Sequence, residues 1–258
     1  MTTLVTWNVN SLNARLPRVI EFLEKHAPDV VFLQETKCEP AAFPDDALAE
    51  AGYAAAHHSA GRWAGVAILA PTGATIEAES HGLAEEPAAD EARWLEATVG
   101  GIRAVSVYVP NGRAVDSPTF TDKLRFLDAA AERIAELAAQ GPLAVAGDFN
   151  VCPADIDVYD PAAFAGSTHV TPRERERYAR LLEAGTVDAY RHLHPDEVGY
   201  TWWDYRQGHF HRGMGLRIDA VLLTPDLAAG LTACGIDRDF RKGQKPSDHA
   251  PLIAELAT

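Results

Sequence analysis

The chain has 258 residues, of which 47% are hydrophobic and 23% charged. This composition excludes a disordered or fibrous chain, and the length is enough for a domain with a sizeable core. No apolar run approaches the ~20 residues of a membrane-spanning helix, and the first residues, MTTLVTWNVN, lack the pattern of a secretory signal. We therefore expect one domain over residues 1–258, in a cytoplasmic monomer with no membrane partner.

The charge balance is strongly acidic, with 23 basic and 37 acidic residues and a net charge of −14. Nonspecific binding to nucleic acid is disfavoured, because phosphate contacts draw on a positive field. A local basic groove, or an acidic site that reaches phosphates through a divalent metal, is compatible with this charge. Cys38, Cys152 and Cys234 are odd in number and widely spaced, which predicts reduced packing residues rather than disulfides or a zinc site.

Short apolar runs predict strands, and apolar residues at helical spacing predict helices. In chain order we expect a strand over Leu4–Val9, a helix with an apolar face from Leu16 to Leu23, strands over Val30–Leu33 and Val66–Leu69, an exposed acidic loop over Leu83–Ala92, a strand over Ile102–Tyr108, a helix with an apolar face from Phe120 to Leu137, a strand over Leu143–Ala146, a helix over Pro172–Glu183, and strands over Ile218–Leu223 and Leu252–Leu256. Strands that alternate irregularly with few helices predict a sheet-rich, layered α/β domain.

Polar clusters lie at the ends of five of these strands. They are Trp7–Asn10, Gln34–Thr36, Gly147–Asn150, Arg217–Asp219 and Ser247–His249. A carboxylate or carboxamide at the end of a buried strand is costly unless it is paired, hydrogen-bonded or metal-bound. If these ends converge, their Asp, Glu, Asn and His side chains form a site that suits Mg²⁺ or Mn²⁺ better than structural zinc, and a phosphate ester is the expected substrate.

Each cluster alone also has a plain structural explanation. Asn8 can cap a turn, Asp148 can belong to an ordinary Gly-Asp turn, and His249 can be a hydrogen-bonded loop residue. Glu35 follows the apolar run Val30–Leu33, where a carboxylate indicates either function or a buried ion pair.

Two spacings favour the functional interpretation. Residues two apart in a strand point the same way, so Asp148 and Asn150 can address one phosphate. Asp219 is a possible orienting partner for His249.

Seven segments taken in order resemble the exonuclease III family of AP endonucleases, within the endonuclease/exonuclease/phosphatase superfamily. They are TWNVNSLNAR, FLQETK, VYVPNG, VAGDFNVCPADID, YTWWDYR, GLRIDAVLL and KPSDHAPL. GDFN is widespread in the superfamily, whereas WWDYR followed by LRID and PSDHAP is close to specific for the exonuclease III branch. The resemblance implies a DNase I-like fold, a four-layer α/β sandwich of two packed mixed β-sheets flanked by helices, with the active site at one edge of the sheets.

The resemblance also implies a Mg²⁺ cofactor, for which Mn²⁺ would substitute. The implied metal site contains Asn8, Glu35, Asp148, Asn150, Asp248 and His249, with Glu35 as the principal ligand. Asn10 stands where some relatives carry Asp, which removes one anionic ligand and weakens a two-metal arrangement.

The implied catalytic residues are Tyr108, Asp148, Asn150, Asp219 and His249. Asp148 would position or deprotonate the attacking water, and Asn150 would hold that water and stabilise the pentavalent phosphate. Asp219 would hydrogen-bond His249 and favour its charged form, so that the imidazole contacts a phosphate oxygen. Tyr108 would hydrogen-bond the scissile phosphate.

The residues implied in DNA binding are Asn111, Arg113, Arg173, Trp202, Leu216 and Ile218. Trp202, Leu216 and Ile218 would line a small pocket for a base-free deoxyribose, with Trp203 as a packing residue. The segment Thr171–Arg177 is either a DNA-contacting loop or a helix start with ion pairs. A subset of the basic residues in or near predicted loops would form a basic rim, drawn from Arg62, Arg113, Arg173, Arg175, Arg177, Arg206, Arg212, Arg217, Arg241 and Lys242.

The sequence therefore predicts a Mg²⁺-dependent DNA repair phosphodiesterase that acts on duplex DNA with abasic sites or blocked 3′ ends. Expected activities are cleavage 5′ to abasic sites, 3′–5′ exodeoxyribonuclease and 3′-phosphatase. The alternatives are an exonuclease-dominant relative and a catalytically inactive protein that binds DNA ends. The inactive alternative is disfavoured because Glu35, Asp148, Asp219 and His249 are all present. WWDYR and LRID disfavour another superfamily phosphodiesterase, such as a nonspecific nuclease or a lipid phosphatase.

Overall fold

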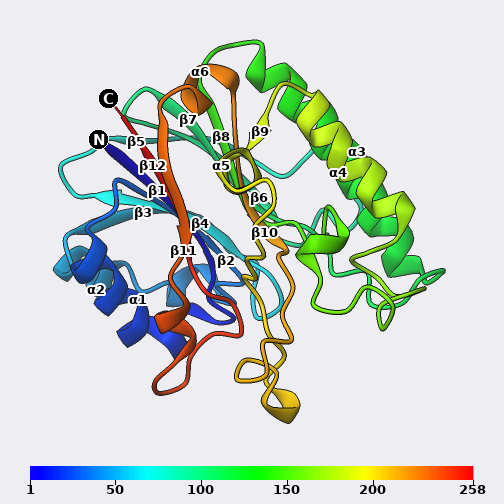
Figure 1. Cartoon of the computed structure of the whole chain (residues 1–258). Helices are drawn as coiled ribbons and strands as arrows, with labels where there is room; N and C mark the ends of the chain where they lie inside the picture. The colour runs from blue at the N-terminus through cyan, green and yellow to red at the C-terminus, as the bar shows by residue number, and fades with distance from the viewer. Residues whose placement is uncertain (258) are drawn as a thin grey trace.

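Two mixed β-sheets are packed face to face in the computed structural model, which describes residues 1–257, and each sheet has six strands within that range (Figure 1). One sheet has the order β11-β12-β1-β2-β4-β3, made of β1 (Thr2–Asn8), β2 (Val30–Gln34), β3 (Tyr53–His58), β4 (Val66–Pro71), β11 (Leu231–Ile236) and β12 (Leu252–Leu256). The other has the order β5-β6-β7-β8-β10-β9, made of β5 (Ile76–His81), β6 (Trp94–Val99), β7 (Ile102–Tyr108), β8 (Leu143–Asp148), β9 (Val187–Asp188) and β10 (Asp219–Leu223). The pairs β1/β2 and β7/β8 are parallel, and the other pairs are antiparallel.

Helices cover both outer faces of the sandwich. The first sheet is covered by α1 (Leu12–His26), and the second by α3 (Pro118–Ala138) and α4 (Pro172–Glu183) on the opposite side of the molecule (Figure 1). Shorter helices are α2 (Asp45–Glu50), α5 (Ala189–Leu193) and α6 (Pro225–Ala228), with 3₁₀ turns at Pro40–Ala42, Asp155–Asp157, Arg206–Gly208 and Arg238–Arg241. The predicted four-layer sandwich is confirmed. No helix within residues 1–257 has both the length and the apolar character needed to cross a bilayer.

Apolar side chains fill all three interfaces between the four layers. Between the sheets, Leu4, Phe32 and Ile68 pack against alanines such as Ala104 and Ala146. Pairing large residues on one sheet with small residues on the other lets the inner faces interdigitate. The alternate residues of the same strands face outward, where Val5 and Leu33 contact Phe22 of α1, and Val107 and Val145 contact Phe126 of α3. This alternation explains why the central strands are almost continuously apolar.

All seven predicted strands and the three predicted helices are present, and α4 has the predicted bounds. Leu83–Ala92 is a loop, as predicted, although Leu83, Pro87 and Ala92 are buried. The sequence analysis did not detect β3, β5, β6, β9 and β11. Four of these are the edge strands of the two sheets.

The segment Thr171–Arg177 forms the start of a helix with ion pairs, and not a loop. Thr171 caps α4 in a reciprocal arrangement with Glu174. Arg175 pairs with Asp155, and Arg177 pairs with Asp128. A DNA contact by the exposed side chain of Arg173 stays a prediction.

Arg217 does not belong to a basic rim, which corrects the sequence analysis. Its side chain is buried and pairs with Asp157 at 2.6 Å and with Asp188 at 2.7 Å. Because an unpaired buried guanidinium would be very costly, the two carboxylates account for its position.

Gly147 of β8 tests the packing beside the strand ends. A Cβ at Gly147 would lie 1.9 Å from the Val107 carbonyl oxygen, whereas one at Gly235 would meet no atom within 4 Å. Gly147→Ala should therefore lower the free energy of unfolding by about 1–3 kcal/mol. Gly235→Ala is the control and should stay within about 0.5 kcal/mol of the wild type. Urea unfolding compares the two variants, and equal stabilities would contradict this packing.

Candidate active site

Strand register brings the predicted catalytic side chains to one edge of the sandwich. In the second sheet, the β7/β8 pairing sets Tyr108 beside Asp148, and the β8/β10 pairing sets Asp148 beside Asp219. In the first sheet, the parallel strands β1 and β2 end level with each other, at Asn8 and at the residue before Glu35. The site is therefore built from both sheets.

The backbone turns sharply where the strands end. Asn10, Glu35 and Asn150 have φ values of 45°, 51° and 52°. Asn tolerates this left-handed region, but Glu seldom adopts it, so the surrounding contacts must hold Glu35 there. Because β8 ends at Asp148, the predicted strand spacing of Asp148 and Asn150 is wrong, and a left-handed turn brings the two together instead.

Three side chains can share a metal ion. Glu35, Asp148 and His249 each present one ligand atom, and these atoms lie within 4.8 Å of one another. Asn8 Nδ2 donates to Glu35 Oε1 at 2.7 Å and to Asp148 Oδ2 at 2.9 Å, while Asn8 Oδ1 accepts from the Asn10 amide. Carboxylate oxygens without thiolates fit a hard divalent cation. Asn8 links the two carboxylates and turns its own oxygen away from them.

Lys37 and Asp248 lie around this cluster. Lys37 Nζ contacts Glu35 Oε2 at 2.6 Å and donates to Asn10 Oδ1 at 2.7 Å. Asp248 accepts from Asn10 Nδ2 at 2.9 Å and from Trp202 Nε1 at 3.0 Å. Asp248 is thus beside the three-residue cluster rather than within it. Lys37, which the sequence analysis did not single out, places a positive charge directly on the principal carboxylate.

His249 is held as a charged donor. Its Nδ1 donates to Asp219 Oδ2 at 2.9 Å, and its Nε2 lies 3.8 Å from Asp148 Oδ2. Burial acts to lower the pKa of His249, but the Asp219 and Asp148 carboxylates outweigh it and raise the pKa to about 10. The hydrogen bond expected between Asp219 and His249 is present. The imidazole is therefore protonated at neutral pH.

Asp148 and Tyr108 both have raised pKa values. Burial, and then the neighbouring Asp219 carboxylate, raise the pKa of Asp148 to about 8. Asp219 Oδ1 is buried and has no hydrogen-bond partner among the described residues. Burial and the charges of Glu35 and Asp148 raise the pKa of Tyr108 well above its usual value, so the phenol keeps its proton. A bound cation would relieve this excess of negative charge.

Asn150 is fixed by several hydrogen bonds. Its Nδ2 donates to the Val109 carbonyl at 2.9 Å, its Oδ1 accepts from Asn111 Nδ2 at 3.1 Å, and its backbone amide donates to Asp148 Oδ1 at 2.9 Å. Asn111 and Arg113 are exposed on the loop that follows Tyr108. The two loops that carry these residues are therefore joined beside the carboxylate cluster.

A cavity of about 800 Å³ lies next to the cluster. Asn111, Arg113, His169 and Trp202 are among the residues that line it. Leu216 and Ile218 are only 1% and 4% exposed and pack with Trp202 in a small apolar cluster. Trp202 thus borders the cavity, whereas Leu216 and Ile218 are buried and are not among its lining residues, contrary to the expected pocket lining.

His169 is a lining residue that sequence analysis missed, since no quoted motif contains it. Its φ is 78°, and its Nδ1 donates to the Asn150 carbonyl at 2.5 Å. Burial lowers its pKa to about 3, so the ring is neutral. Because Nδ1 carries the proton, Nε2 is left as an acceptor.

A second cavity lies on the side of Glu35 and Tyr108. It is also lined by Lys37, Arg93 and the 70% exposed Trp63, which the sequence analysis missed.

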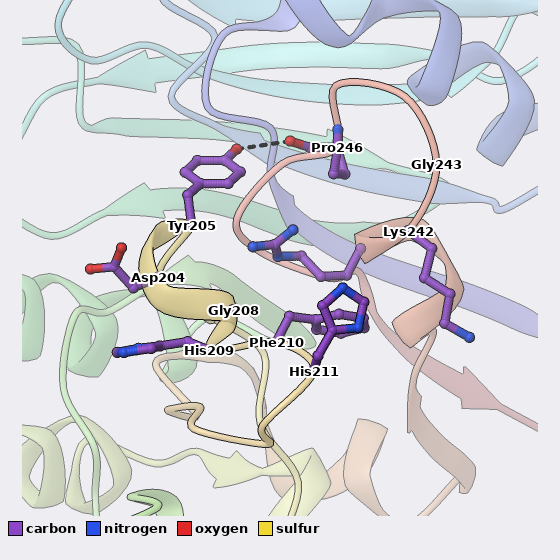
Figure 2. A pocket seen from close by; sticks show the side chains of 10 residues that line it. Asp204, Tyr205, Gly208, His209, Phe210, His211, Lys242, Gly243 and Pro246 are labelled. Atoms are coloured by element: carbon purple, nitrogen blue, oxygen red, sulfur yellow. Dashed lines mark hydrogen bonds between the residues drawn. The ribbon is translucent and has the colours of Figure 1, made fainter.

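The segment WWDYR (Trp202–Arg206) contacts the loop before His249. Tyr205 and Pro246 both line a cavity of about 270 Å³, and the Tyr205 hydroxyl donates to the Pro246 carbonyl at 2.8 Å (Figure 2). The Arg241 guanidinium lies 4.9 Å from the centre of the Tyr205 ring. Trp203 is buried, as predicted, and makes an edge contact with Phe210. The position of Asp248 is thus coupled to this segment.

Known proteins share the sequence pattern and the fold of this chain. Residues 5–249 match the Endonuclease/Exonuclease/phosphatase family. Exodeoxyribonuclease III of Haemophilus influenzae is 32% identical, over 98% of each chain. The structure of the 3′ phosphatase NExo from Neisseria, bound to a product DNA hairpin, superimposes over all of both chains with a TM-score of 0.94 and 38% identity. An AP endonuclease from Archaeoglobus fulgidus does so with a TM-score of 0.95 and 36% identity.

Asp219→Asn tests the charge state of His249. In metal-free protein, the pKa of His249 should fall from about 10 toward its ordinary value of about 6.5. Because the pKa of His249 is higher in the folded than in the unfolded state, its protonation stabilises the folded wild type. This stabilisation is complete below the unfolded-state pKa and is lost as the pH rises toward 10. The stability advantage of the wild type over the variant should therefore shrink across that window. NMR titration of the ring and urea unfolding in EDTA measure both effects, and an unchanged His249 pKa would contradict the assignment.

Proposed function

Because this chain belongs to the Endonuclease/Exonuclease/phosphatase family, as a hydrolytic nuclease of the exonuclease III and AP endonuclease type, we propose that it processes the 3′ ends of duplex DNA. In this proposal it removes 3′-phosphates and 3′-terminal nucleotides with the help of Mg²⁺. Cleavage 5′ to abasic sites is the second candidate activity. The convergence of Glu35, Asp148 and His249 carries the proposal, since it unites metal ligands with an acid–base pair.

The metal would be held by Glu35 and Asp148, whose oxygens lie close together and are linked by Asn8. When bound, Mg²⁺ offsets the negative charge on the phosphate and on the leaving oxygen. His249 contributes mainly as an imidazolium, because Asp219 holds its proton on Nδ1 and its charge faces Asp148. Asp248 would hold Asn10 in place by accepting a hydrogen bond from its side-chain amide, and Asn150 would hold Asp148 in place by donating one from its backbone amide.

The other side chains divide the acid–base work. Asp148 has a pKa of about 8 in the metal-free protein; a bound cation would keep its carboxyl ionised, and the carboxylate would then take a proton from the attacking water. Tyr108 keeps its proton and can donate a hydrogen bond to a phosphate oxygen, as the imidazolium of His249 can on the other side. The Asn150 backbone amide donates to Asp148 Oδ1 and would hold this carboxylate in place toward the water. Asn111 and Arg113 would contact the DNA backbone.

His169 favours removal of a terminal 3′-phosphate over cleavage at internal abasic sites. Its ring occupies one wall of the cavity that Trp202 also lines, where a base-free sugar would be received. Its bond to the Asn150 carbonyl fixes the ring there. A terminal 3′-phosphate has no downstream sugar to accommodate, so a narrowed cavity does not hinder it. The match to a 3′ phosphatase over the whole chain supports this preference.

Abasic-site cleavage retains support as the second activity. Trp202 borders the cavity and is tied to Asp248 beside the carboxylate cluster. The AP endonuclease from Archaeoglobus fulgidus has the same fold over the whole chain. Both activities consist of an attack by water on a phosphate ester, so one set of catalytic residues serves both.

Asp148→Asn tests the hydrolytic mechanism. The variant should still bind duplex DNA but lose about 10³-fold in the single-turnover rate of 3′-phosphate release, because it lacks the base. EDTA should abolish release by the wild type. Asp226→Asn, at an exposed carboxylate in α6, is the matched control and should retain wild-type rates. Near-normal turnover by Asp148→Asn would contradict the role of Asp148 as the base. Undiminished activity of the wild type in EDTA would contradict the need for a metal ion.

His169→Gly tests substrate preference. Glycine adopts a φ of 78° without strain, so the variant should fold, and the cavity beside Trp202 should widen. The ratio of abasic-site cleavage to 3′-phosphate release should rise about 10-fold or more, because space for the sugar is regained. Rates on an end-labelled duplex with a central abasic analogue and on a duplex with a 3′-phosphate give this ratio. An unchanged ratio would contradict the role assigned to His169.

A further inference from the structure

We propose that the buried ion pair between Lys123 and Glu174 positions Asn150 and Asn111 for the reaction, acting from behind the active site. This inference rests on the proposed function of Asn150. Lys123 belongs to α3 and Glu174 to the first turn of α4, and both side chains are 0% exposed. Neither residue is one of the three that can share a metal ion, and neither belongs to a motif that identified the site.

The ammonium group of Lys123 connects α3 to both site loops. Its Nζ donates to the Asn150 carbonyl at 2.6 Å, to Thr168 Oγ1 at 3.1 Å and to the Asn111 carbonyl at 3.3 Å, and it pairs with Glu174 Oε1. The loop after β7 and the loop after β8 are therefore held by one charged group. Charge-assisted hydrogen bonds of this kind are stronger than neutral ones.

Glu174 is itself anchored at the start of α4. Its Oε1 accepts from Thr168 Oγ1 and from the His169 amide, both at 2.8 Å. Its Oε2 accepts from the Thr171 amide at 3.0 Å and from Thr171 Oγ1 at 2.6 Å. The carboxylate is therefore fully hydrogen-bonded in a rigid position, and it fixes the direction in which Lys123 extends.

The target of this support is a residue with a left-handed backbone conformation. Asn150 has a φ of 52°, and its backbone amide donates to Asp148 Oδ1. Its carbonyl accepts from both Lys123 and His169. If the Lys123 bond is lost, the peptide can rotate toward an ordinary conformation, and the Asn150 amide leaves the position beside Asp148. Small displacements of this kind are costly to catalysis even when binding is retained.

A purely structural pair would behave differently under substitution. A buried ion pair can often be replaced by neutral residues of similar shape with little loss of stability. The double variant Lys123→Met/Glu174→Gln removes both charges and keeps the volumes similar. Stability should therefore recover most of what Lys123→Met alone loses, but no donor replaces Nζ at the Asn150 carbonyl. If Lys123 positions Asn150, the double variant should recover stability but not catalysis.

The test compares the double variant with Glu96→Gln. Glu96 is another nearly buried carboxylate, 1% exposed, and it is paired with Arg133 away from the site. For 3′-phosphate release, the double variant should lose about 10- to 100-fold in kcat with KM changed less than about threefold, whereas Glu96→Gln should keep wild-type kcat. Wild-type kcat in a stable double variant would overturn the proposal. If the double variant does not fold, Glu174→Gln alone is used, with a smaller loss of kcat expected.

A second measurement is independent of activity. The side-chain amide resonances of Asn150, assigned by NMR in metal-free protein, should shift or broaden in the double variant and stay unchanged in Glu96→Gln. Unchanged Asn150 resonances in the double variant would overturn the proposal even if the enzyme has another substrate. Absence of wild-type turnover on DNA, with the expected shift present, would instead contradict the proposed function alone.

Discussion

Two buried carboxylates, Asp148 and Asp219, lie opposite each other on neighbouring strands, and much of the site serves to stabilise that pair. Burial, and then the like charge of Asp219, disfavour the ionised carboxylate and raise the pKa of Asp148 to about 8. His249 offsets one charge by keeping its proton against burial. Asn8 donates to Asp148 from the other sheet. The two sheets are thus connected electrostatically at the edge where their strands end.

The central strands were predicted from the sequence because they depend on local patterns, whereas the roles of the site residues were predicted from the resemblance to a family. Strands buried on both faces are almost continuously apolar, and the polar residues that follow them are conspicuous. The four edge strands were missed because they are short of apolar residues: β3, for example, has the sequence YAAAHH, and most of its residues are not fully buried. Central β6 was missed since Glu96 and Thr98 interrupt its apolar pattern, although Glu96 is neutralised by Arg133 of α3.

Residues that act through tertiary contacts could not be found from the sequence. His169 and Lys123 reach the Asn150 carbonyl from segments 19 and 27 positions away, and no periodicity links them to it. The left-handed turn at Asn150 was also not predictable, since the same spacing in a strand would place its side chain beside that of Asp148 equally well. Sequence patterns therefore identify the residues that define the chemistry, but not the contacts that place them.

The acidic charge of the chain is consistent with a DNA substrate once the ion pairs are taken into account. Arg175, Arg177 and Arg180 of α4 are paired with carboxylates on their own or neighbouring segments, and Arg217 is buried. Arg113, by contrast, makes no ion pair within residues 1–257 and lines both cavities beside the carboxylate cluster. These ion pairs reduce the number of cations available for phosphate contacts, which limits nonspecific attraction along a duplex.

Catalysis and substrate preference are supported by different parts of the same segment. Glu174 fixes the backbone amide of His169, and through Lys123 it fixes the Asn150 carbonyl, so the path of the chain is set by a buried charge pair. The His169 ring, by contrast, projects to the cavity wall from a position whose φ also suits glycine. A change of side chain at this position alters the room for a sugar and removes one of two hydrogen bonds to the Asn150 carbonyl, while Lys123 keeps the other. Preference between a terminal phosphate and an internal abasic site can therefore change by one substitution while the hydrolytic groups remain in place.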